Sequence, residues 1–181
     1  MAAKTFGGKK IAIRRITTAD LKHAKKFQVF INALIREEAK ILMAKEVTLK
    51  EEKEFLKKVL AGAKERTKIY FAAECDGEIV ATTSIELDRL RKNHIGKFGI
   101  VIKQGYRGIG LGTYLMSEII KAAKKELRPT PKMIQLDVYT DNKPAIGLYK
   151  KMGFRRVARI PKQVQYKGKL VDEFVMQLYL K

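Results

Sequence analysis

Apolar and polar residues alternate from Lys10 to Ile16, and the cluster Thr17-Thr18-Ala19-Asp20 follows directly. Alternation with period two predicts a half-buried strand, and Thr and Asp are residues that cap the start of a helix. Apolar residues then recur at spacings of three and four from Phe27 to Ile35. This spacing predicts a helix that runs to about Glu38, so the chain is expected to begin with a strand and then a helix.

A second helix is marked by the sequence Thr48-Leu49-Lys50-Glu51. This is a capping box, in which the Thr hydroxyl accepts from a backbone N–H and the Glu carboxylate reaches back to the cap. Gly62 is expected near the end of that helix. From Lys68 to Asp88 the pattern returns to period two around Asp76-Gly77, a strong signal for a two-residue hairpin, so an antiparallel strand pair is expected there.

The second half of the chain alternates strands and helices. The expected elements are a strand over Ile95 to Ile102, a helix with apolar face Leu111, Leu115, Ile119 and Ala122 that ends before Pro129 and Pro131, a strand over Met133 to Tyr139, a helix from Asn142 to Gly153, and strands over Arg155 to Ile160 and Leu170 to Leu180. This order predicts an α/β fold, namely a mixed sheet with helices packed against it. No repeat or linker divides the chain, so residues 1–181 are interpreted as a single domain.

Composition is consistent with an ordinary globular domain. Hydrophobic residues make up 46% of the 181 residues, and no apolar run approaches the roughly 18 residues that a spanning helix needs. Met1 to Lys10 contains lysines without the apolar stretch of a signal peptide. The one cysteine, Cys75, cannot pair within its own chain and is expected in the core. A cytoplasmic location is therefore predicted. The sequence also predicts no metal site.

The net charge of +20 is unevenly distributed along the chain. Residues 89–132 hold eleven bases and two acids, and residues 141–169 hold nine bases and one acid. By contrast, residues 28–65 hold eight bases and seven acids, and are nearly neutral. A strongly basic surface is typical of proteins that bind anions, including nucleic acids, although a solvated lysine surface is the simpler explanation.

The segment Arg107-Gly108-Ile109-Gly110-Leu111-Gly112-Thr113 lies between an expected strand and an amphipathic helix. Free backbone N–H groups and the helix dipole make such a junction an anion site, and glycines let the backbone approach a phosphate closely. The segment lacks Gly-Lys-Ser/Thr and is therefore not a P-loop, and it lacks the initial strand-helix-strand unit of a dinucleotide fold. A tight turn is the alternative explanation, but three glycines at a helix start favour phosphate binding.

At this point the sequence resembles a known family. Arg107-Gly108-Ile109-Gly110-Leu111-Gly112 is similar to motif A of the GNAT (Gcn5-related) N-acetyltransferases, R/Q-x-x-G-x-G/A, which binds the pyrophosphate of acetyl-CoA. Asn142 to Phe154, preceded by Leu136-Asp137-Val138-Tyr139, resembles motif B, N-x-x-A-x-x-L-Y-x-x-x-G-F. The similarity covers roughly residues 9–181. One departure is Gln104, where many members have Pro before the Arg-Gly pair.

The resemblance implies a set of site residues. Acetyl-CoA is the implied cofactor, with its pantetheine arm held by the backbone of Ile100, Val101 and Ile102 and by Asn142. The pyrophosphate would be held by the N–H groups of Arg107, Gly108, Ile109, Gly110, Leu111, Gly112 and Thr113. Tyr149 matches the residue that in many members donates a proton to the departing CoA thiolate. Its helix face also carries Ala145 and Met152, so Tyr149 could instead be a core residue.

The group that removes the proton from the amine is less clear. Glu86 shares a strand face with Thr82, Ser84 and Asp88, a polar row that could face a cleft or solvent. His94 precedes the strand that leads to motif A, near a position where several members carry Glu, and it could titrate near neutral pH. Glu86 and His94 are the candidate bases, and a relay of water molecules without a dedicated base is equally compatible with the sequence.

The acceptor is expected beside the two early helices, as the resemblance implies. Glu37 and Glu38, in the near-neutral segment of a basic chain, are the candidate residues that bind it. The predicted function is transfer of acetyl from acetyl-CoA to a primary amine, with a protein lysine or N-terminal amine as first choice. The alternatives are a polyamine or other small-molecule acetyltransferase, and a noncatalytic domain that binds RNA or ribosomes through its basic surface.

Overall fold

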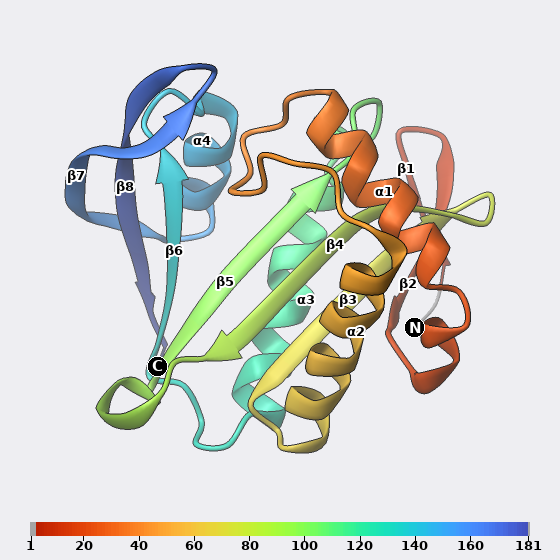
Figure 1. The fold of residues 1–181 in the computed structure, drawn as a ribbon. Helices are drawn as coiled ribbons and strands as arrows, with labels where there is room; N and C mark the ends of the chain where they lie inside the picture. The colour runs from red at the N-terminus through yellow and green to blue at the C-terminus, as the bar shows by residue number, and fades with distance from the viewer. Residues whose placement is uncertain (1–2, 181) are drawn as a thin grey trace.

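The computed structural model describes residues 3–180, which form one eight-stranded sheet with helices on both faces (Figure 1). The strands are β1 (Ala3–Phe6), β2 (Lys9–Arg15), β3 (Lys68–Cys75), β4 (Glu78–Leu87), β5 (Ile95–Ile102), β6 (Met133–Tyr139), β7 (Arg155–Tyr166) and β8 (Lys169–Tyr179). The α-helices are α1 (Ala24–Arg36), α2 (Leu49–Lys64), α3 (Leu111–Glu126) and α4 (Lys143–Lys151). Two short 3₁₀ turns, Thr18–Leu21 and Leu90–Lys92, complete the secondary structure.

The order of strands in the sheet is β1-β2-β3-β4-β5-β6-β8-β7. Every neighbouring pair is antiparallel except β5 and β6, which are parallel. Helices α1 and α2 cover one face of the sheet, and α3 lies on the other face together with α4 (Figure 1). The predicted mixed sheet with flanking helices is therefore confirmed.

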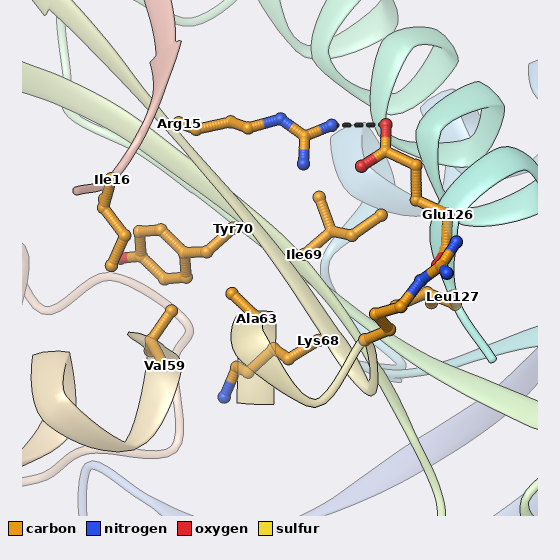
Figure 2. Close-up of a pocket in the computed structure, with 10 residues that line it drawn as sticks. Arg15, Ile16, Val59, Ala63, Lys68, Ile69, Tyr70, Glu126 and Leu127 are labelled. Atoms are coloured by element: carbon orange, nitrogen blue, oxygen red, sulfur yellow. Dashed lines mark hydrogen bonds and ion pairs between the residues drawn. The ribbon is translucent and has the colours of Figure 1, made fainter. Parts of the chain in front are cut away.

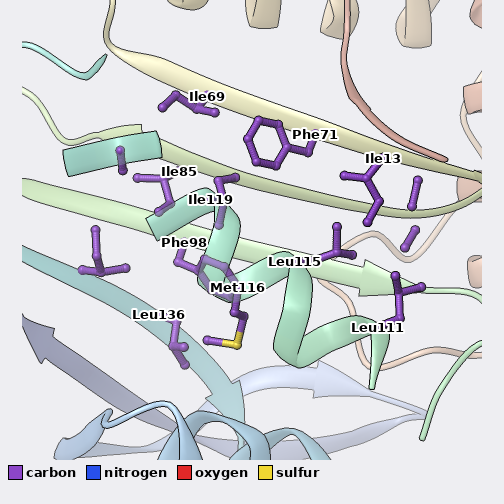
Figure 3. Packing of buried hydrophobic residues seen from close by; sticks show 14 of the residues in the cluster. Ile13, Ile69, Phe71, Ile85, Phe98, Leu111, Leu115, Met116, Ile119 and Leu136 are labelled. Atoms are coloured by element: carbon purple, nitrogen blue, oxygen red, sulfur yellow. The ribbon is translucent and has the colours of Figure 1, made fainter. Parts of the chain in front are cut away.

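The core is divided between the two faces of the sheet. The larger part lies under α3, where Leu111, Leu115, Met116 and Ile119 are fully buried (Figure 3). These positions repeat at spacings of three and four, so a single stripe of α3 packs on the sheet. The smaller part holds Phe27, Leu34 and Leu56 from α1 and α2. Cys75 is 5% exposed, as predicted for a core residue.

Three boundaries differ from the sequence prediction. A first strand, β1, pairs with β2 through a Gly7-Gly8 turn in which both glycines have positive φ. Thr17 and Asp20 form a capping box around a 3₁₀ turn, and α1 begins only at Ala24. Strand β7 continues past Pro161 to Tyr166, because it is an edge strand with a register shift between Ile160 and Val164, where the missing proline N–H is not needed.

Within residues 3–180, none of the helices has the length and apolar character of a membrane span.

A carboxyl group on the inner face of α2 makes stability depend on pH. Glu52 is 6% exposed, and burial raises its pKa from 4.5 to about 7. A raised carboxyl pKa means that the folded state binds the proton more tightly than the unfolded state, so stability is lost as pH rises from 4.5 through 7. Glu52→Gln removes this cost, because the amide never has to ionise.

We expect Glu52→Gln to raise the free energy of unfolding by roughly 2 kcal/mol at pH 8 and to change it little at pH 4. Urea unfolding at the two pH values measures the difference. The exposed Glu65, at the end of the same helix, supplies the control Glu65→Gln, for which no such dependence is expected. An equal gain for Glu52→Gln at both pH values would show that packing, and not ionisation, is responsible.

Candidate functional site

The parallel strands β5 and β6 separate part of the way along their length. Their pairing consists of Ile95 with Met133, Gly96 with Ile134 and Lys97 with Gln135, although β5 continues to Ile102 and β6 to Tyr139. Beyond Lys97 the facing edges of the two strands carry backbone N–H and C=O groups that no strand of residues 3–180 pairs. A gap of this kind in the middle of a sheet can accept an extended polar chain as if it were a strand.

Backbone groups in β5 alternate between its two neighbours. The Lys103 N–H donates to Val80 and the Asp88 N–H donates to Ile95, so odd-numbered residues of β5 pair with β4. The groups of Ile100 and Ile102 therefore face the gap, and their contact with the cofactor stays a prediction. Those of Val101 pair with Thr82 of β4, which corrects its prediction as a residue that binds the cofactor through its backbone.

The glycine-rich segment 103–110 follows β5 and ends at the start of α3. Among residues 3–180, no oxygen accepts a hydrogen bond from the backbone N–H groups of residues 107–113. Gly105, Gly108 and Gly110 have φ of 83°, 76° and 88°, and a Cβ on any of them would meet no atom within 4 Å. The open space, the free N–H groups and the positive end of α3 together form an anion site.

Other contacts fix this segment in place. A Cβ on Gly112 would lie 3.1 Å from Leu148 of α4 and 3.3 Å from Ile102, so a glycine is needed for close packing between α3, α4 and β5. On the other side, the turn at Gly7 packs against Ile109. That turn places the Lys9 ammonium 4.8 Å from the ring centre of Tyr106, so part of the basic charge lies beside the glycine-rich segment.

The Arg107 side chain is directed back into the protein. Its Nε donates to the Ile102 carbonyl oxygen at 2.7 Å, and its guanidinium forms an ion pair with Glu37. Glu37 also accepts from the Gln104 N–H at 3.2 Å. Glu38, the next residue, forms an ion pair with Lys167 in the turn between β7 and β8. Because both carboxylates are paired with basic residues, these contacts do not support the prediction that Glu37 and Glu38 bind an acceptor amine.

Residues 37–48, which connect α1 and α2, form a bridge over the wide end of the gap (Figure 1). Lys40 and Asp141, after β6, form an ion pair at 2.7 Å, and the Tyr139 hydroxyl donates to the Ile41 carbonyl oxygen at 2.9 Å. The Tyr166 hydroxyl donates to the Glu38 carbonyl oxygen at 2.7 Å. The bridge thus joins the two halves of the sheet on the face covered by α1 and α2.

Tyr149 of α4 lies on the opposite face of the sheet. Its ring packs edge-on against Phe98 of β5, with centroids 6.2 Å apart, and against Phe154. Phe98 is the first residue of β5 beyond its paired segment. Tyr149 is 8% exposed, and burial raises its pKa to about 12, so the phenol remains protonated at neutral pH.

The Tyr149 hydroxyl is nevertheless accessible. It forms no hydrogen bond within residues 3–180, yet no fully buried side-chain oxygen or nitrogen in that range lacks a partner. The hydroxyl oxygen must therefore reach solvent. A protonated, unpartnered phenol beside the opening of the gap is suited to donate a proton there.

Asn142 caps α4 through its side-chain oxygen, which accepts from the Ala145 N–H at 3.4 Å. The amide nitrogen keeps its two donors, since it makes no hydrogen bond in the described part of the chain. The capping contact fixes the side chain at the end of β6, where the gap is widest. The predicted contact of Asn142 with a cofactor arm remains compatible with this geometry.

The two candidate bases lie at the closed end of the gap. Glu86 is exposed and forms an ion pair with Lys68 at 2.6 Å, and its strand partner on β5 is Lys97. His94 precedes β5 and accepts through its backbone oxygen from the Lys132 N–H. Phe98 lies four positions after His94, which corresponds to roughly 13 Å along a strand. The structure brings neither residue next to Tyr149.

Two carboxylates beside the gap, Asp137 of β6 and Glu173 of β8, are not among the site residues predicted from the sequence. Strand β6 pairs with β8 along the whole length of β6, with Asp137 opposite Val175 and Tyr139 opposite Glu173. Asp137 lies within the sequence that resembles motif B, and alternation along β6 would have predicted that its side chain points away from the α3 core. No local sequence pattern predicts that Asp137 lies close to Glu173.

One enclosed cavity lies away from the gap. A cavity of about 140 Å³ is bounded by Val59, Ile69 and Leu127 and by the ion pair between Arg15 and Glu126 (Figure 2). It lies at the end of the sheet where β3 and β5 begin, whereas the glycine-rich segment follows the end of β5. It therefore has no part in the site at the gap.

Part of the excess positive charge is neutralised internally. Arg14 pairs with Asp20 and Glu74, Arg15 with Glu126, and Arg159 with Asp172. Arginine side chains are common contacts for RNA, the alternative partner predicted from the basic surface. Their ion pairs reduce the cationic surface available for such a contact, and a nucleic-acid role for the remaining lysines stays a prediction.

Comparison with known proteins identifies relatives along much of the chain. The model of a family described as "Acetyltransferase (GNAT) family" matches residues 31–154. The L-amino acid N-acetyltransferase AaaT of Escherichia coli is 34% identical over 102 residues, which are 56% of this chain and 62% of that protein. An N-alpha-acetyltransferase of Sulfurisphaera tokodaii is 32% identical over 105 residues, covering 52% and 60%. The chain thus spans about three fifths of the length of these relatives.

Solved structures match nearly the whole fold. An acetyltransferase of the GNAT family from Streptococcus pneumoniae superposes with a TM-score of 0.81 and 28% identity, covering 94% of this chain and 99% of that one. The structure of yncA from Salmonella typhimurium with its cofactor acetyl-CoA superposes with a TM-score of 0.77 and 20% identity, covering 94% of each chain. The second likeness supports the fold alone.

Proposed function

Since the chain belongs to the GNAT acetyltransferase family, we propose that it transfers the acetyl group of acetyl-CoA directly to a primary amine. The observation that carries this proposal is the set of unpartnered backbone N–H groups from Arg107 to Thr113, at the end of a strand that has parted from its parallel neighbour. A diphosphate at the start of α3 and an extended arm in the gap are the two parts of CoA that such a site fits.

In this proposal the chain holds the cofactor mainly through its backbone. The N–H groups of residues 107–113 bind the pyrophosphate, and the groups of Ile100 and Ile102 pair with the amides of the pantetheine arm. The Asn142 amide nitrogen donates to the same arm. Because the N–H donors are already oriented and lack partners among residues 3–180, they bind the cofactor without the loss of an internal hydrogen bond, whereas the Ile102 carbonyl oxygen already accepts one from Arg107 Nε.

In this proposal Tyr149 is the general acid that protonates the departing thiolate. The amine attacks the thioester carbon, a C–N bond forms, and the C–S bond breaks with its electron pair on sulfur. The Tyr149 hydroxyl then donates its proton to the thiolate and recovers a proton from solvent. Burial keeps the phenol protonated until charge develops on the sulfur, which is the condition for an effective acid.

The proposed acceptor is an amine on a protein or peptide, either a lysine or an N-terminal amine. The two relatives are named as an L-amino acid N-acetyltransferase and as an N-alpha-acetyltransferase, and both names point to α-amino groups. A free amino acid or another small amine is therefore the alternative acceptor. For a polyamine, the net charge of +20 opposes approach over long distances.

Calorimetric titration with acetyl-CoA and with CoA, at low and at raised salt, tests the proposal. We expect a micromolar dissociation constant that persists at raised salt, because oriented N–H groups and not loose surface charge make the contacts. Acceptor peptides and amino acids are then screened for release of free thiol. Absence of heat and of any thermal shift with CoA would refute the cofactor site and with it the proposed function.

A further inference from the structure

Asp137 and Glu173 are neighbours on the face of β6 and β8 that lies under the bridge. Tyr139, whose hydroxyl reaches the bridge, is the strand partner of Glu173 and is two residues from Asp137, so all three side chains share one face. Asp137 and Glu173 are diagonal neighbours across the pair, with Cβ atoms roughly 7 Å apart. The hydrogen bond from Gln177 to Gln135, at 3.0 Å, continues the same polar row toward the closed end of the gap.

These two carboxylates have no partner in the described part of the chain. The nearby cations are engaged elsewhere, Lys40 with Asp141 and Lys167 with Glu38. Glu173 is nevertheless 8% exposed, and its burial together with the charge of Asp137 raises its pKa. In a chain with 39 bases and 19 acids, a buried carboxylate left without a cation is costly to the fold.

The pair lies at the gap. Continuing the register of Lys97 with Gln135 by two residues brings Asp137 opposite Gly99 of β5. Gly99 is exposed although β5 is a central strand, and a Cβ there would meet only Ser84, at 3.6 Å. The sheet is therefore open in front of Asp137, on the face opposite to that of Tyr149.

We propose that Asp137 and Glu173 bind the acceptor as an alkylammonium ion and that Asp137 accepts its proton. This inference rests on the proposed acetyltransferase function and names the acceptor subsite of that same site. Two adjacent carboxylates without a cation attract a primary ammonium group, which offers three donors, and disfavour an anionic or neutral nucleophile. The acceptor class is thus an aliphatic amine that is protonated at neutral pH.

The proton balance follows from this arrangement. The ammonium gives one proton to Asp137, and the neutral amine attacks the thioester carbon through its lone pair. The nitrogen loses a second proton to solvent as the C–S bond breaks, and the sulfur takes a proton from Tyr149. When Asp137 and Tyr149 have exchanged protons with solvent, the products are the amide, CoA with a free thiol and one released proton.

The test uses the full chain with acetyl-CoA and the best acceptor of the screen. We expect Asp137→Asn to lower kcat about 100-fold or more, within the range for loss of a general base. Glu173→Gln should raise the KM for the acceptor about tenfold with a smaller change in kcat. Asp137→Glu, which keeps a carboxylate, should recover at least a tenth of the wild-type kcat, which a merely structural role would not require.

Two controls separate the possible outcomes. Glu65→Gln removes an exposed acid remote from the gap and should leave all constants unchanged. CoA affinity should be the same in every variant, which shows that they are folded. If wild type binds CoA and turns over while Asp137→Asn and Glu173→Gln stay within threefold of it, the acceptor subsite is wrong and the proposed function stands. If wild type neither binds CoA nor turns over, the proposed function itself fails.

Discussion

Replacement of Gly110 by Leu is expected to abolish CoA binding while the fold persists. The leucine side chain would project into the open space before the N–H groups of residues 107–113, where the diphosphate must lie. Hydrogen bonds from N–H groups to a charged phosphate are worth roughly 1.5–3 kcal/mol each, so loss of two of them lowers affinity at least 100-fold. Titration at concentrations that saturate the wild type measures the loss.

The matched control for this substitution is Gly77→Leu. Gly77 has φ of 79° and, as at Gly110, a Cβ there would meet no atom within 4 Å, but Gly77 lies in the hairpin between β3 and β4. Both substitutions strain the backbone to a similar degree, so both should lower the melting temperature. Only Gly110→Leu should lose CoA. Normal CoA affinity in a folded Gly110→Leu protein would exclude this segment as the pyrophosphate site.

Replacement of Tyr149 by Phe is expected to lower kcat between tenfold and a thousandfold, the range for loss of a general acid. Phe keeps the ring that packs against Phe98 and Phe154, and the missing hydroxyl has no protein partner among residues 3–180. Stability and CoA affinity should therefore change little. Steady-state kinetics with thiol detection, beside calorimetry with CoA, measures both quantities.

Tyr179→Phe provides a comparison, because Tyr179 is 67% exposed at the end of β8. It should match the wild type in every constant. A Tyr149→Phe enzyme with unchanged kcat would remove this hydroxyl from the reaction and make solvent the source of the thiol proton. A large loss of CoA affinity would instead assign Tyr149 to cofactor binding.

Local sequence patterns were sufficient for most of the secondary structure. The capping box at Thr48, the Asp76-Gly77 hairpin and the apolar stripe of α3 occur where they were predicted, because each depends on residues within one or two turns of one another. The missed strand β1 has its own local signal, the Gly7-Gly8 turn. The predicted strand stopped at Ile160, before Pro161, whereas β7 continues past it. Proline is tolerated there because β7 is an edge strand.

In the candidate site, too, some features depend on local sequence and others depend on the tertiary structure. The glycines from Gly108 to Gly112 and the position of Asn142 at a helix start are local features, so the sequence by itself determined the anion-binding segment and the family resemblance. By contrast, the direction of the Val101 backbone depends on its register with β4. The ion pair of Glu37 with Arg107 joins residues 70 positions apart.

Only the tertiary structure decided which carboxylates are available to an amine. Glu37 and Glu38, which the charge pattern selected, are neutralised by Arg107 and Lys167, whereas Asp137 and Glu173 meet across two strands and remain unpaired within residues 3–180. The physical reason is that a sequence determines the charge of a side chain, but the free energy of that charge depends on neighbours and burial. Both are set by strand order and register, which bring distant segments together.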